Sequence, residues 1–328
     1  MELTQYKKKI TDKLRSLAET YLKTEEPLSA TERCCVSINH QEFSIACINQ
    51  HDEVNEIVFL EKIRFDDLES LSLVLKGVAE KHNLAQTPIY WLLNPDEYQL
   101  NLIETLPVPK NEFQTALSWR VRSLIDYPVE EAIIEHFELP AKKNSDDIPL
   151  IGAVTAKKAQ LSDMILLLKD SGLRLVTIDI PELALLNLTS LYETDEKTSA
   201  FLYFYGNTVI LNISSKKILY FTRRIPVTKK DEAGIDYEKL SLEILRYFDF
   251  FRSQWRLSTP SRIFAASDTG DANIIATALT ERLLSTVEPY TLNSTIIDTD
   301  EKNQVVANYL LDYGCLLRKE PSNASAND

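Results

Sequence analysis

The order of the predicted strands and helices is the feature that most constrains how this chain can fold. Three short runs rich in β-branched and aromatic residues, then an amphipathic helix and another strand, occupy residues 33–93. The same order recurs over residues 199–266, although no sequence identity accompanies it. A chain that carries the same series of elements twice is expected to fold into two related α/β lobes.

Length and charge limit the classes of function. The chain has 328 residues, enough for two lobes, and a net charge of −13. So acidic a chain is not expected to bind nucleic acid, because a phosphate backbone needs a basic face. No run of apolar residues is long enough to cross a bilayer, and the first residues lack the apolar core of a signal peptide. We therefore expect neither a membrane span nor secretion.

Cysteine and histidine spacing predicts no metal site. The cysteines form no CxxC pair and the four histidines form no HExxH or Cys/His cluster, so we expect free thiols in strands. The motifs of a serine-hydrolase elbow and of a P-loop are also missing. The cysteines are Cys34, Cys35, Cys47 and Cys315.

The first 30 residues are expected to form a separate amphipathic helix and linker. Apolar residues recur at helical spacing over residues 4–23, and Glu25-Glu26-Pro27 ends the pattern. The helix either contacts an acidic membrane surface through its lysines or packs on its own domain with those lysines in water; we favour the second alternative. The lysines concerned are Lys7, Lys8, Lys9 and Lys13.

A helix stop at Asp126-Tyr127-Pro128 lies in the middle of the first lobe. Pro128 disfavours a helical conformation at Tyr127, and a short turn then leads into an apolar-alternating run. This corner resembles the "xxIPFPLEEV" corner of the PilM/GspL-type proteins of bacterial pilus and type II secretion machines. Further segments resemble motifs of that family in the same order, the helix 242–254 ("LxxEIxRSLDYYRSQ") most specifically. They are residues 166–173, 177–185, 220–226, 242–254 and 313–318.

The resemblance implies a two-lobed actin-like (ribonuclease H-like) ATPase fold. We expect the first lobe over residues 31–190 with an inserted subdomain at about 107–172, the second lobe over 191–320, and a disordered tail over 321–328. Within the first lobe, Asn111 is expected to cap the helix that reaches Ile125. Asp179, at a strand end before Pro181, is expected to cap the next helix rather than to act in catalysis.

The resemblance also locates the nucleotide positions, and most of them lack the residues that ATP requires. In the family, two glycine-bearing hairpins hold the phosphates, acidic residues hold Mg²⁺, and a paired-glycine loop holds the adenosine. Here serines replace the metal-side Asp and the Lys of the first hairpin, and a Phe replaces the Asp of the second. We therefore expect a pseudo-ATPase with no cofactor and no metal, with bound ATP/Mg as the alternative. The positions are Ser37, Asn39, Ser44, Phe204, Gly206, Ser267 and Asp268.

The function that the resemblance implies is that of a non-catalytic adaptor. It would serve a type IV pilus inner-membrane assembly platform, most similar to the MshI-type subgroup of mannose-sensitive haemagglutinin (MSHA) pilus biogenesis. Its partner would be the cytoplasmic tail of a PilN-like single-pass membrane protein, with the assembly motor ATPase and a second copy as further partners. Such a protein is cytoplasmic and peripheral to the inner membrane through its partners. The alternatives are an ATP-binding switch of the same machine and a sugar-kinase-like phosphotransferase.

By the same resemblance the tail would lie in a groove of the first lobe, near the corner at Pro128. A strand edge there would offer backbone hydrogen bonds, and aromatic and Arg side chains would anchor the peptide. Arg120 and Tyr127 are expected on the surface, whereas Trp119 and Phe137 are either contacts or core residues. The candidate contacts are Trp119, Arg120, Tyr127 and Phe137.

Overall fold

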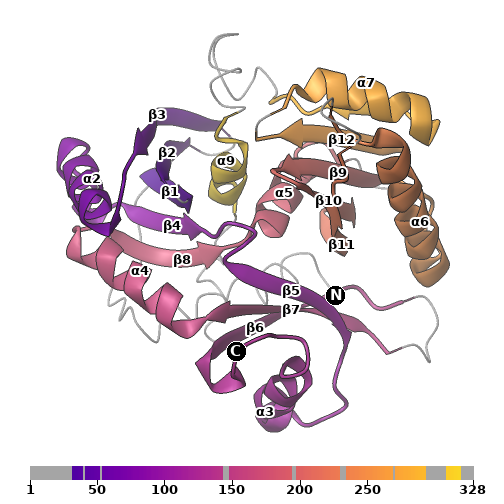
Figure 1. Cartoon of the computed structure of the whole chain (residues 1–328), viewed down its shortest axis with the longest axis horizontal. Coiled ribbons are helices and arrows are strands. Elements are labelled where there is room, and N and C mark those ends of the chain that lie inside the picture. Colours follow the sequence, from indigo (N-terminus) through magenta and orange to yellow (C-terminus); the bar gives the residue numbers. More distant parts are fainter. Residues whose placement is uncertain are drawn as a thin grey trace. The chain divides into compact units, whose positions relative to one another are not determined.

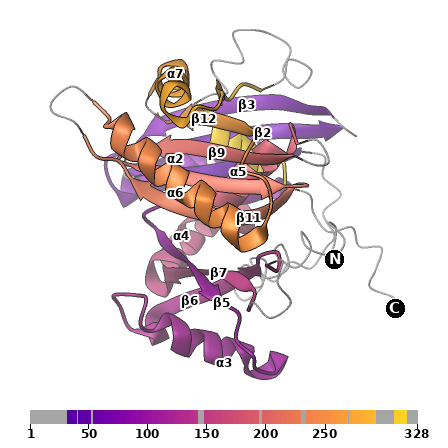
Figure 2. The ribbon, with the colours of Figure 1, turned by 90° about the vertical axis from the view of Figure 1, so that its right-hand side faces the viewer.

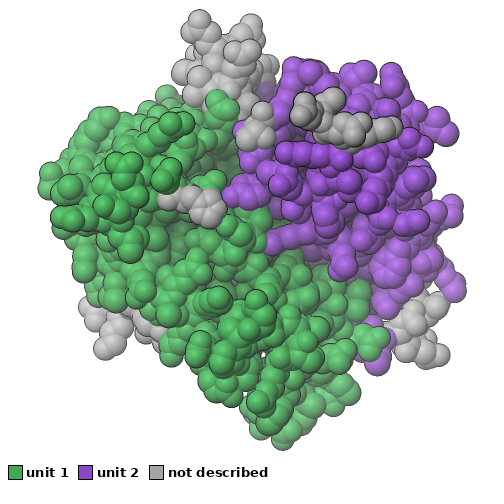
Figure 3. Space-filling model, viewed as in Figure 1, with its two compact units in different colours: residues 1–138, 150–184, 294–328 green, residues 139–149, 185–293 purple. Residues whose placement is uncertain are grey.

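The chain forms two compact units in a computed structural model (Figure 3). The structure describes residues 32–39, 41–51, 54–142, 148–193, 197–229, 234–268, 270–292 and 308–318. The expected N-terminal helix and C-terminal tail lie outside these residues. Unit 1 comprises residues 1–138, 150–184 and 294–328, and unit 2 comprises residues 139–149 and 185–293.

A five-stranded sheet forms the centre of unit 1, in the order β3-β2-β1-β4-β8 (Figure 1). Its first three strands form an antiparallel meander, and β4 and β8 run parallel to β1. The strands are β1 (Glu32–Asn39), β2 (Glu42–His51), β3 (Val54–Arg64), β4 (Pro88–Leu92) and β8 (Arg174–Asp179). The associated helices are α2 (Leu68–Lys81), the 3₁₀ turn η1 (Leu84–Gln86), α4 (Lys158–Asp170) and α9 (Leu310–Leu316).

The inserted part of unit 1 is a three-stranded antiparallel sheet, β5-β7-β6, with α3 on one side of it (Figure 2). Leu117 and Val121 of α3 are buried against apolar residues of the three strands, Ile103, Ile134, Ile151 and Ala153. Removing these side chains from water stabilises the pairing of helix and sheet. The elements are β5 (Tyr98–Glu104), α3 (Lys110–Val121), η2 (Val129–Glu131), β6 (Ala132–Glu138) and β7 (Leu150–Lys157).

Two details of this insertion differ from the prediction. It spans residues 98–157 rather than about 107–172, because β5 joins its sheet and α4 packs on β8 of the larger sheet. Helix α3 begins at Lys110 after Pro109, so Asn111 lies inside the first turn and is not the cap. Proline at the N-cap position fixes φ near the helical value and starts the helix without a side-chain cap.

Unit 2 contains the second five-stranded sheet, in the order β11-β10-β9-β12-β13. Helix α6 places one apolar face inward, and the indole N–H of Trp255 at its end donates to the carbonyl of Pro140 at 3.0 Å. Asp236 and Asp271 cap α6 and α7 through backbone N–H groups. The elements are β9 (Thr198–Tyr205), β10 (Thr208–Ser215), β11 (Ile218–Pro226), α6 (Tyr237–Trp255), β12 (Arg262–Ser267), α7 (Ala272–Leu283) and β13 (Val287–Pro289).

The two large sheets share one strand order, which confirms the prediction of two related lobes. In each, the first three strands form an antiparallel meander, and the next strand runs parallel to the first strand of that meander. The boundaries differ from those expected. Helix α5 (Pro181–Ser190) begins in unit 1 and ends in unit 2, and α9 belongs to unit 1 rather than to the lobe 191–320. Helix α9 belongs there because it packs on β1, β2 and β4.

Candidate functional site

The β1–β2 hairpin brings together two of the predicted nucleotide positions. Ser37 and Ser44 are direct partners in the antiparallel register, so both side chains lie on the same face of the sheet, and their Oγ atoms are 2.6 Å apart. Ser44 Oγ donates to Oδ2 of Asp312 on α9 at 2.9 Å. Asn39, the third predicted position, is exposed at the end of β1. The hydroxyls that replace the metal-side Asp and the Lys thus bond to the interior of unit 1.

Asp312 explains why serines suit these positions. Its carboxyl group is buried, and burial raises its pKa to about 6, while hydrogen bonds from Ser44 and Ser37 act in the opposite direction. A second carboxylate at position 37 would face this buried acid, and like charges in a low dielectric repel strongly. An Asp at position 37 would therefore be unfavourable beside Asp312. Neither periodicity nor a motif predicts this role of Asp312.

The polar contacts continue along α9 toward the start of β1. Arg33 donates from Nη1 to the carbonyl of Arg318 at 2.9 Å, and Arg318 Nη1 pairs with Asp179 Oδ2 at 2.8 Å. Asp179 Oδ1 also accepts the N–H of Ile180, just before α5. The N–H of Ile180 precedes the first helical residue, Pro181, so this bond is not the expected helix cap. The Asp179 carboxylate instead forms a buried ion pair with the C-terminal segment. A buried pair of this kind is costly to break on one side only.

In unit 2, Phe204, Ser267 and Asp268 lie together at the ends of β9 and β12. The N–H of Asp268 donates to the carbonyl of Phe204 at 3.0 Å, and the N–H of Gly270 donates to Ser267 Oγ at 2.8 Å. Gly206 has a φ of +53° in the tight turn between β9 and β10, a conformation that suits glycine. Phosphate loops present unbonded N–H groups, whereas these two N–H groups are already bonded within unit 2.

The α3 surface, which we define as Trp119, Arg120, Arg122 and Leu124, contains two of the predicted contact residues. The Trp119 side chain is 68% exposed, so it is not a core residue, and the Arg122 guanidinium lies 5.6 Å from its ring centroid. Arg120 is exposed beside it and Leu124 adds an exposed apolar side chain. An exposed indole with adjacent cations is a common anchor in protein interfaces.

The other two predicted contacts are less accessible. Phe137 is only 3% exposed and lies against Gly152, where an added Cβ would fall 2.3 Å from its ring. Phe137 is therefore a core residue of the insertion. Tyr127 is half-buried with Lys157 Nζ 5.4 Å from its ring centroid, and burial raises its pKa.

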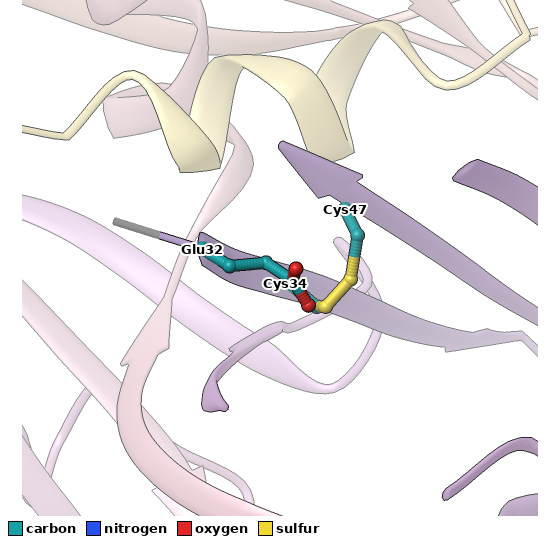
Figure 4. A group of neighbouring side chains, drawn as sticks. All are labelled: Glu32, Cys34 and Cys47. Carbon is teal, nitrogen blue, oxygen red and sulfur yellow. A yellow bond between two sulfur atoms is a disulfide. The ribbon is translucent and has the colours of Figure 1, made fainter. Parts of the chain in front are cut away.

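The cysteines correct the expectation of free thiols. Cys34 and Cys47 are direct partners on β1 and β2, with Cα atoms 4.1 Å apart, and form a disulfide (Figure 4). Cys35 and Cys315 are free and buried. The pairing depends on strand register and therefore could not be read from a separation of 13 residues. The carboxylate of Glu32 lies beside the two sulfur atoms.

Comparison with known proteins gives a clear result for the fold. No family model and no curated sequence matches the chain. Among solved structures, the PilM-PilN type IV pilus biogenesis complex matches with a TM-score of 0.67 and 15% identity over 87% of this chain and 98% of that chain. A Bacteroides thetaiotaomicron protein with an actin-like ATPase fold gives a TM-score of 0.54 at 9% identity, over 89% of this chain and 97% of that one. The fold is actin-like.

A third match lies in a secretion machine. The cytoplasmic domain of EpsL, an inner membrane component of the type II secretion system of Vibrio cholerae, gives a TM-score of 0.53 and 15% identity over 88% of this chain and 96% of that chain. In the part of this chain that the structure describes, no helix combines the length and apolar character needed to cross a membrane. At these identities the comparisons establish the shared actin-like fold, as the resemblance implied.

Proposed function

We propose that this chain is an adaptor of a bacterial inner-membrane assembly platform of the type IV pilus or type II secretion kind. The observation that carries the proposal is the match to a chain of the PilM-PilN type IV pilus biogenesis complex, which covers 98% of that chain. The match to the EpsL cytoplasmic domain points to the same class of machine. The partner would be the short cytoplasmic tail of a PilN-like membrane protein, and the chain would be held at the inner membrane through it.

The adaptor would work without nucleotide chemistry. In unit 1, Ser44 Oγ is bonded to Asp312, and a metal-binding Asp at position 37 would face that buried acid. In unit 2, the loop N–H groups of Asp268 and Gly270 are bonded internally. The retained Gly206 turn is the one feature that favours the alternative, an ATP-binding switch in the same machine.

The finer assignment is to the MSHA pilus subgroup of these machines. It rests on the resemblance of residues 33–318 as a whole, which is greatest to the MshI-type subgroup. The assembly motor ATPase and a second copy of this chain would be further partners. Co-purification from membranes with a PilN-like protein of the MSHA pilus system would support this assignment. Exclusive recovery with a type II secretion protein would contradict it.

The α3 surface is the tail-binding region in this proposal. Trp119 and Arg120 are exposed there, and neither is needed for the apolar core of the insertion, which consists of other residues. An exposed indole and a guanidinium can anchor an extended peptide, while β5 and β6, the edge strands of the described three-stranded sheet, supply backbone partners.

Fluorescence anisotropy with a labelled tail peptide of the PilN-like partner tests this region. Trp119→Ala and Arg120→Ala should each raise the Kd by about tenfold, equivalent to about 1.4 kcal/mol, with unchanged melting temperatures. Lys110→Ala, at the exposed start of the same helix, is the matched control and should leave the Kd unchanged. If both α3-surface variants bind the peptide with wild-type affinity, the tail does not bind at this helix.

A further inference from the structure

We propose that Glu32, Cys34 and Cys47 form a binding site for a thiophilic divalent metal ion such as zinc, which is available only when the two cysteines are reduced. In the oxidised state the two cysteines form the disulfide that joins β1 to β2. In the reduced state the same two sulfur atoms and the Glu32 carboxylate are the metal ligands. This inference does not depend on the proposed adaptor function.

Strand geometry brings the three donors together. Glu32 and Cys34 are two residues apart on β1, so they lie on one face of the sheet, and Cys47 is the direct partner of Cys34 on β2. One ligand atom from each of the three residues lies within 4.8 Å of the others, and Figure 4 shows the carboxylate beside the sulfur atoms. Among the described residues, this is the one group of three His, Cys, Asp or Glu side chains that converges so closely.

The donor set suits zinc. Thiolates and a carboxylate are common zinc ligands, and three protein donors leave a fourth position for water. Both cysteines are fully buried and Glu32 is partly buried. Two thiolates in such surroundings need a nearby positive charge, which the metal supplies. No described residue forms a hydrogen bond or ion pair with the Glu32 carboxylate, which therefore remains available as a ligand.

The second pair of buried cysteines provides an internal contrast. Cys35 and Cys315 lie near Asp312 and Asp179. These carboxylates already bond to Ser44 and to the Arg318 guanidinium, respectively, and a fixed cation beside the thiols disfavours a metal ion. Both cysteine pairs are therefore buried, but only the pair Cys34 and Cys47 lies beside a carboxylate that is not already bonded to another described residue.

The redox step balances with an external dithiol. The dithiol transfers two electrons and two protons, the Cys34–Cys47 bond breaks, two thiols form, and the dithiol becomes a disulfide. Zinc then binds as the two thiol protons leave to solvent. Reoxidation requires release of the metal, so the disulfide and the metal-bound state exclude each other.

Zinc titration of the full chain tests the proposal. Protein reduced with a dithiol, desalted without oxygen and titrated with Zn²⁺ against a chromophoric chelator should bind one zinc per chain. The oxidised protein should bind none, and zinc should raise the melting temperature of the reduced protein alone. Cobalt added in place of zinc should give thiolate–cobalt absorption that is lost in Cys47→Ser.

Variants separate the ligands from general effects on folding. Glu32→Gln, at the partly exposed start of β1, should fold normally and weaken zinc binding at least about tenfold. Cys35→Ser is the matched control and should keep the full stoichiometry. Reduced wild-type protein without bound zinc, a Glu32→Gln variant with unchanged affinity, or equal loss in Cys35→Ser and Cys47→Ser would each overturn the site.

Discussion

At the scale of single residues, Ser37 connects the β1–β2 hairpin to the interior of unit 1 through hydrogen bonds. Its hydroxyl lies 2.6 Å from that of Ser44, which in turn donates to the buried Asp312. The family resemblance predicted that Ser37 and Ser44 replace an Asp and a Lys. It did not predict the acid that they face, because Asp312 is 268 residues from Ser44 in the sequence. Contacts of that separation depend on the fold and leave no local pattern.

Restoring the metal-side acid should destabilise the protein. Ser37→Asp places a second carboxyl group beside Asp312, and we expect a loss of about 1–3 kcal/mol at pH 7. Urea unfolding at equilibrium measures it. The double variant Ser37→Asp/Asp312→Asn should recover most of the loss, because the like-charge contact is gone. Additive losses in the double-mutant cycle would show that the two side chains do not interact.

The raised pKa of Asp312 predicts a pH dependence of stability. Burial raises the pKa of Asp312 in the folded state to about 6, above the ordinary value of an Asp side chain, so the folded state holds the proton more tightly. The stabilising effect of that proton is complete below about pH 4 and is lost as the pH rises toward 6. Asp312→Asn should therefore have a flatter stability profile between pH 4 and 6 than wild type, as measured by thermal melts. Parallel pH profiles of stability for wild type and Asp312→Asn would show that Asp312 does not cause the pH dependence.

At the scale of elements, local patterns predicted most strands and helices but not all. The meanders near residues 33 and 199, and the amphipathic helix that follows each of them, agree with the periodicity of the sequence. Strand β5 was missed, although Tyr98, Leu100 and Leu102 alternate with polar residues. The disulfide was missed as well, because strand pairing sets which cysteines face each other. In the candidate site, the sequence left both Trp119 and Phe137 open between surface contact and core residue, because exposure depends on packing; Trp119 is exposed and Phe137 is buried.

The pairing of β6 with β7 depends on one glycine. Gly152 is the register partner of Phe137, whose ring occupies the space of a Cβ. Gly152→Ala should cost about 1–3 kcal/mol through overpacking. Combining it with Phe137→Leu should return part of the stability, since a smaller side chain leaves room for the methyl group. Thermal melts of the two single variants and the double variant provide the measurement, and an undisturbed melt in Gly152→Ala would show that the ring moves aside freely.

At the scale of the whole molecule, the repeated strand order is that of an actin-like ATPase fold, whereas the proposed adaptor function needs no nucleotide. We expect MgATP at millimolar concentration to leave the melting temperature unchanged, because Ser44 is bonded to Asp312 and the N–H groups of Asp268 and Gly270 are bonded within unit 2. Differential scanning fluorimetry with Mg²⁺ alone as the control measures this. A shift of several degrees that requires both ATP and Mg²⁺ would instead favour the switch.

Helix α9 follows unit 2 in the sequence but belongs to unit 1, so unit 1 is complete only after all of unit 2 has been synthesised. Ribosomes release the chain from its N-terminus, so residues 33–184 emerge long before Asp312 and Arg318, the partners of Ser44 and Asp179. Until then the nascent first unit holds Asp179 without its guanidinium, and an unpaired buried charge costs about 3–5 kcal/mol. Unit 2, by contrast, lies wholly upstream of α9. A released chain that ends at residue 305 should therefore protect unit 2 from protease better than unit 1, and during synthesis unit 1 would be the last to become stable.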